Sequence, residues 1–128
     1  MTLQEMFDKA YMGLASQGFK KCLGGGAKWF SWVAESKGTC VYSDGNGKHC
    51  AWGWVDLSLD KNVIGLVSDL KNWRIGIAAT LDEEQLDFAS KLQLVHDKSD
   101  NQQDMKNNLK KLADEYKLLV PILLERKR

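Results

Sequence analysis

The chain has 128 residues, of which 44% are hydrophobic and 27% are charged, and its formal net charge is +1. This length fits a single domain over residues 1–128 with a real hydrophobic core, and the near-balanced charge gives no reason to expect nonspecific binding to nucleic acid. We expect a cytoplasmic protein with no membrane partner, because no apolar run reaches the roughly 18–20 residues of a membrane span and the N-terminus lacks the pattern of a signal peptide.

An amphipathic helix is predicted over residues 2–17. Thr2 and Glu5 have the spacing of a capping box, and Gly18 is placed to end the helix. A glycine run at residues 24–26 follows, and the aromatic residues after it favour a short helix that ends near residue 38. Glycines ahead of a helix can present N–H groups to a phosphate, but the phosphate-loop pattern is missing, so a connecting loop is the favoured interpretation.

Residues 39–54 are predicted to form a small antiparallel β-hairpin. The segment 44–47 reads Asp-Gly-Asn-Gly, which accepts the positive φ angles of tight turns, and the flanking residues suit strands. The register stays open between several turns. A three-residue loop would place Cys40 opposite Cys50, on the strand face that Trp52 shares. A hairpin this small must pack on the helices to be stable.

The cysteines and histidine of this stretch do not fit a metal site. Zinc needs about four ligands in paired short spacings, which Cys40, His49 and Cys50 do not supply. A Cys40–Cys50 disulfide is sterically feasible across a hairpin, but three cysteines without a signal peptide favour a reducing compartment and two buried thiols. We therefore predict no metal and no cofactor. A cysteine nucleophile paired with His96 is the enzymatic alternative.

A helix over residues 60–72 is predicted after the hairpin, because apolar residues recur there at helical spacing. Gly65 weakens this prediction by about 1 kcal/mol relative to alanine. Residues 73–77 alternate between apolar and other side chains, so a short strand and an extended connection both remain open.

An antiparallel pair of amphipathic helices is predicted over residues 81–118, with the first helix at 81–97 and the second at 101–118. Residues 119–128 form a tail. The capping signals are Thr80 with Glu83 for the first helix and Ser99 with Gln102 for the second.

Polar side chains stand on the apolar stripe of the helix predicted at 81–97. His96 lies on the stripe, Gln93 lies at its edge and Asp97 follows. A polar group that is buried without a partner costs about 1–3 kcal/mol. We therefore interpret His96 first as a hydrogen-bonded residue that ties this helix to the hairpin backbone, with ligand binding and catalysis as alternatives. Asp97 either orients the imidazole or ends the helix in solvent.

Two short motifs carry a resemblance to a known family. The segment from Cys40 to Gly53 reads C-x-Y-x4-G-x-x-C-A-x-G, and the segment from Leu92 to Asp97 reads L-Q-x-x-H-D. In this order they resemble a family of small proteins from phage genomes and bacterial prophage regions, over roughly residues 2–118. Members carry an apolar-Pro-Asp-Glu turn after the first motif, and this chain does not. The resemblance implies phage origin and an accessory role in the host cytoplasm, without a specific activity.

Together these patterns predict an α+β domain in which four to five helices pack around the hairpin. The absence of a recognisable catalytic set favours binding over catalysis. We predict a phage-type accessory protein that inhibits host defence by binding a host protein or a small nucleotide-type signal. The alternative is a small hydrolase or transferase that uses Cys40 or Cys50 with His96. The apolar segment 118–124 around Pro121 either packs on the domain or mediates self-association into a homo-oligomer. The candidate binding residues are Cys40, Tyr42, Cys50, Trp52, Gln93, His96 and Asp97.

Overall fold

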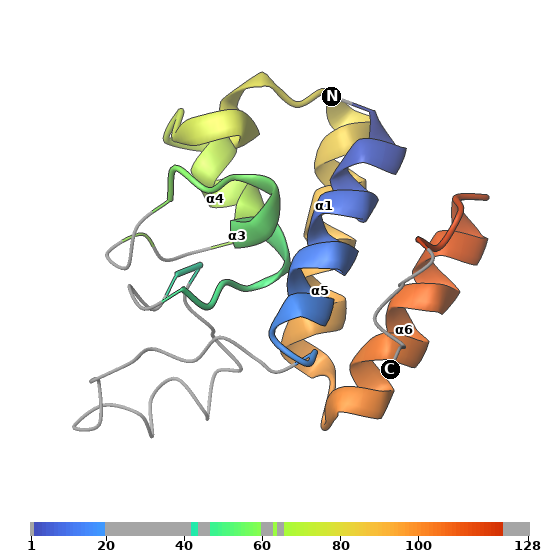
Figure 1. Ribbon diagram of the computed structural model, residues 1–128. Coiled ribbons are helices and arrows are strands. Elements are labelled where there is room, and N and C mark those ends of the chain that lie inside the picture. Colours follow the sequence, from blue (N-terminus) through green and yellow to red (C-terminus); the bar gives the residue numbers. More distant parts are fainter. Residues whose placement is uncertain (1, 20–41, 44–46, 60–62, 64–65, 122–128) are drawn as a thin grey trace.

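The computed structural model describes residues 2–19, 42–43, 47–59, 63 and 66–121, and these parts of the chain are mainly helical (Figure 1). The glycine run at 24–26, the short helix predicted near 29–38 and Cys40 lie outside the described residues. The elements are α1 (Leu3–Ser16), α3 (Ala51–Val55), α4 (Val67–Asn72), the 3₁₀ helix η2 (Gly76–Thr80), α5 (Glu83–Lys98) and α6 (Gln102–Glu115).

The predicted β-hairpin, and with it the α+β fold class, is wrong. No β-strand occurs among the described residues, where Ser43 and His49 form only an isolated antiparallel bridge. The backbone N–H of Cys50 donates to the carbonyl of Tyr42 at 3.3 Å. The chain therefore reverses direction near the predicted turn, but residues 51–55 form α3 in place of a second strand.

Residues 51–55 form a helix because contacts specific to this fold outweigh their strand propensity. The sulfur of Cys50 accepts the N–H of Gly53 at 3.4 Å and so caps the first turn of α3. A side chain at position 53 would collide with the carbonyl oxygen of Tyr42, so only glycine allows this approach. Trp54 packs against α1, where a side chain at Gly13 would overlap its indole ring.

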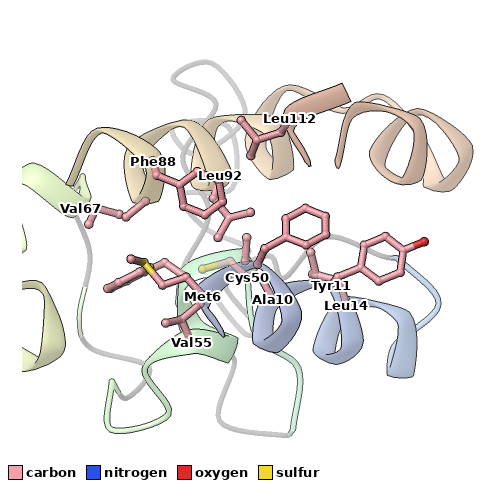
Figure 2. Close-up of a cluster of buried hydrophobic side chains, with 14 of the residues drawn as sticks. Met6, Ala10, Tyr11, Leu14, Cys50, Val55, Val67, Phe88, Leu92 and Leu112 are labelled. Atoms are coloured by element: carbon pink, nitrogen blue, oxygen red, sulfur yellow. The ribbon is translucent and has the colours of Figure 1, made fainter. Parts of the chain in front are cut away.

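The hydrophobic core lies between α1, α3 and α5, whose side chains point toward one another (Figure 2). α6 packs on α5, and the turn between them makes the two helices antiparallel (Figure 1). α4 packs on α5 and on η2. The labelled core residues are Met6, Ala10, Tyr11 and Leu14 of α1, Cys50 and Val55 at α3, Val67 of α4, Phe88 and Leu92 of α5, and Leu112 of α6.

The long helices begin close to where their periodicity predicts, although their caps differ. Thr2 and Glu5 form the predicted capping box of α1. The predicted box of Thr80 with Glu83 is wrong, since Thr80 ends η2. Asp82 and Gln85 cap α5 instead. The cap of α6 is Asn101, whose side chain accepts the N–H of the third helical residue at 2.9 Å, and not the predicted Ser99.

The tail after α6 returns to the start of α1. The side-chain amide of Gln4 donates to the carbonyl of Leu119 and accepts its N–H, both at 2.9 Å. This pair of bonds imitates one rung of a β-ladder and fixes the tail at that point. Residues 122–128 lie outside the described part of the chain, and self-association through the tail stays a prediction.

None of the helices in the described ranges has the length and apolar character needed to cross a membrane.

Candidate functional site

The predicted site residues gather at the contact between α3 and α5, apart from Cys40, which the structure does not describe. Tyr42, Cys50 and Trp52 come from α3 and the segment before it, and all are buried. On α5, Gln93 and His96 are buried, and the side chain of Asp97 is 17% exposed. The two sequence motifs therefore meet in space although about forty residues separate them.

Gln93 makes the direct link between the two motifs. Its side-chain oxygen accepts the backbone N–H of Trp52 at 3.0 Å, and its amide nitrogen donates to Asp97 at 2.9 Å. The N–H of Trp52 belongs to the first turn of α3 and has no partner inside that helix. Gln93 therefore caps α3 from a neighbouring helix, a role that no local pattern in the sequence indicates.

The Cys50 sulfur accepts a second N–H from the same helical turn, that of Gly53. The thiol of Cys50 is buried, and the sulfur lies among apolar side chains between α1 and α5 (Figure 2). The thiol thus acts as a helix cap and as a small core residue at once.

His96 is fully buried, and its Nδ1 lies 3.1 Å from the Asp97 carboxylate. The same carboxylate oxygen accepts the amide N–H of Gln93. Asp97 therefore orients both the imidazole and the amide, which is the first of the two roles predicted for it. We call Cys50, Gln93, His96 and Asp97 together the α3 brace.

Tyr42 lies near Cys50 and Asp97 of this brace as a neutral phenol. Burial raises the pKa of Tyr42 well above its usual value, and the nearby Cys50 and Asp97 add to the shift. A phenol with so high a pKa stays protonated at physiological pH, so Tyr42 is neither a base nor a nucleophile in this setting.

A second polar contact, which the sequence did not indicate, links the end of α1 to α3 and to the segment before it. The amide of Gln17 donates to the carbonyl of His49 at 2.8 Å and accepts N–H groups from the His49 backbone and the Trp54 indole, both at 3.1 Å. The His49 ring packs edge-on against Trp54, with ring centres 4.6 Å apart. Gln17 follows the last residue of α1, where a polar residue normally faces solvent. Its position in the sequence therefore does not indicate this role.

Two buried ring nitrogens in this region make no hydrogen bond, namely Trp52 Nε1 and His49 Nδ1. An unsatisfied buried polar atom costs about 1–3 kcal/mol. No group of three or more histidine, cysteine or acidic side chains in the described ranges is placed to hold a metal ion. A ligand-binding role for the brace residues stays a prediction, and their observed partners are parts of the chain itself.

The fold and this contact define a small helical protein in which buried polar side chains hold a short helix between two longer ones. No protein-family model, curated protein or solved structure matches the chain. The resemblance to phage and prophage proteins therefore rests on the two motifs, whose residues include the α3 brace.

Proposed function

We propose that this chain is a phage-type accessory protein that works by binding in the host cytoplasm and inhibits a host defence process. Its target is a host protein or a small nucleotide-type signal. The resemblance of the two motifs supports the phage origin. The observation that carries the choice of binding over catalysis is the complete burial of Cys50 and His96 within the α3 brace.

A cysteine enzyme needs a thiolate that can reach its substrate and a base within hydrogen-bond reach of it. The Cys50 sulfur accepts a backbone N–H of α3, and the His96 imidazole is held by Asp97. A substrate would have to open the contact between α3 and α5 to reach either group. This arrangement favours a structural role for the motif residues and leaves recognition to the surface.

Exposed apolar side chains favour a protein as the partner. Leu57, Leu66 and Trp73 are each more than half exposed. Tryptophan in particular contributes strongly to protein interfaces.

The proposal can be tested by phage challenge followed by affinity capture. Bacterial strains with different defence systems would express the chain, and the efficiency of phage plating would be measured. The tagged chain would then capture partners from lysate of a responding strain, with mass spectrometry of proteins and of released nucleotides. We expect raised plating in at least one strain and a captured partner in that strain. No effect in any strain, together with no captured partner, would contradict the proposal.

Variants separate a binder from a Cys/His enzyme. Cys50→Ser and His96→Gln are expected to lower plating only as far as they lower the melting temperature, because both residues support the fold. The sulfur of Cys40 is tested in the same way with Cys40→Ser. Loss of the plating effect at an unchanged melting temperature would favour the enzyme.

A further inference from the structure

Two apolar side chains at the ends of α4 are exposed. Leu66 is the N-cap of this helix and is 65% exposed, and Trp73 is its C-cap and is 57% exposed. The intervening Val67 and Leu70 are buried in the core. Leu66 and Trp73 are seven residues apart, which is close to two helical turns, so both fall at one edge of the buried stripe of Val67 and Leu70, with about 10 Å between their Cα atoms.

Arg74 adds a positive charge beside Trp73. Its φ angle is +59°, and the turn is held by bonds from Arg74 N–H to Lys71 and from Ile75 N–H to Leu70, at 3.1 and 2.9 Å. The other charged side chains of this helix are engaged, since Asp69 accepts the Leu66 N–H and Lys71 donates to the carbonyl of Leu81, which is the C-cap of η2. The exposed Arg74 side chain makes no hydrogen bond or ion pair with the described part of the chain.

We propose that Leu66, Trp73 and Arg74, which we call the α4 edge, form the docking surface of this protein. The partner is a protein segment that carries two apolar side chains about 10 Å apart and a carboxylate next to one of them. In a partner helix this corresponds to apolar residues at i and i+7. The inference rests on the proposed function, because it identifies the surface through which the binding protein would act.

The chemistry of the edge favours a protein over the other occupants. A nucleotide could stack its base on Trp73 and pair its phosphate with Arg74, but it would leave Leu66 unused. The net charge of +1 also adds little attraction for a polyanion. A symmetric dimer of this chain would repeat the same patch on both sides, and so would supply a second arginine and no acid.

Peptide selection on the full chain tests the proposal. A random twelve-residue display library would be selected on the wild type, on Trp73→Ser and on Arg74→Glu. The wild type is expected to enrich peptides with paired apolar residues and an adjacent Asp or Glu. Trp73→Ser should weaken the best peptide about 30-fold, as expected for a central interface tryptophan. Arg74→Glu should shift the selected peptides from acidic to basic residues.

Leu119→Ser is the matched control, because Leu119 is 78% exposed and lies at the tail, outside the α4 edge. It should leave selection unchanged, and equal melting temperatures of all variants would show that folding is intact. The proposal is overturned if the wild type enriches no peptide, or if the best peptide binds Trp73→Ser as tightly as it binds the wild type. It is also overturned if Arg74→Glu selects peptides with the same charge as the wild type does. A dimer that Trp73→Ser dissolves, or binding of AMP or GMP that depends on Trp73, also overturns it.

The two proposals can fail separately. If Trp73→Ser raises phage plating and captures the host partner as well as the wild type does, the α4 edge is wrong and the proposed function stands. If the wild type selects acidic peptides but affects no strain and captures nothing, the docking surface stands and the proposed function fails.

Discussion

The α3 brace and the α4 edge are built from different residue types and serve opposite purposes. In the brace, the polar atoms of Gln93 and Asp97 are directed at neighbouring groups of the same chain, and the surrounding side chains are buried. At the edge, Trp73 and Arg74 are exposed, and the turn that presents them is fixed by backbone bonds. The sequence motifs mark the brace, whereas no motif marks the edge.

This difference separates residues that keep the fold from residues available to a partner. Changing the brace should alter the free energy of unfolding and affect binding only through the folded fraction. Changing the edge should alter binding at constant stability. The following predictions test this separation, beginning with the largest effect.

Gly53→Ala should destabilise the protein most, by more than about 4 kcal/mol, because the new methyl group would collide with the Tyr42 backbone. Urea unfolding would measure the loss. Gly47→Ala is the control, since position 47 has open space around it and only its positive φ angle of 100° opposes the change. That strain costs about 1–2 kcal/mol. Equal losses at the two glycines would argue against the close approach of α3 to Tyr42.

Leu70→Ala and Leu66→Ala compare the inner side of α4 with its exposed edge. Leu70 is fully buried, so its truncation should cost about 3 kcal/mol. Leu66 is largely exposed, and its truncation should change the free energy of unfolding by less than about 0.5 kcal/mol. The same urea titration measures both. A large loss for Leu66→Ala would mean that the edge supports the fold and is unsuited to docking.

Gln93→Met tests the brace itself at nearly constant side-chain size. The change leaves the Trp52 N–H without its Gln93 acceptor and removes the amide N–H that Gln93 donates to Asp97, and it should cost about 2 kcal/mol. Gln103→Met is the control, because that glutamine is exposed on α6 and bonds only to a side chain one turn away. It should be close to neutral. If both variants unfold at the same urea concentration, Gln93 does not stabilise α3.

Tyr42→Phe should change how stability depends on alkaline pH. Because the pKa of Tyr42 is raised in the folded protein, the native state holds the phenolic proton more tightly than the unfolded chain does. The contribution of this proton to the free energy of unfolding is fully present below about pH 10. It is lost as the pH rises above that value, by up to about 1.4 kcal/mol per pH unit. The free energy of unfolding, measured from about pH 9 to pH 11, should therefore fall more steeply in the wild type than in Tyr42→Phe. Parallel curves would mean that Tyr42 is not protected by burial.

Much of the helical frame follows from local pattern. The long apolar stripes predict α1, α5 and α6 to within a few residues, and the capping box of Thr2 and Glu5 is present as predicted. The burial of His96 also follows from its place on an apolar stripe. These features depend on neighbours within about one or two turns of a helix, which a sequence records directly.

The structure of residues 50–55 depends on groups that are distant in the chain. Their tryptophans and the glycine-rich turn before them favour a strand pair, and the return of the chain at Ser43 and His49 is retained. The helical outcome is supported by Gln93, which supplies an acceptor from 41 positions away, and by the fit of Gly53 against Tyr42. Local propensities differ by only about 1 kcal/mol per residue, so a few such contacts can outweigh them. The exposure of the α4 edge is decided in the same way, because which side of a helix stays free depends on the elements that pack against it.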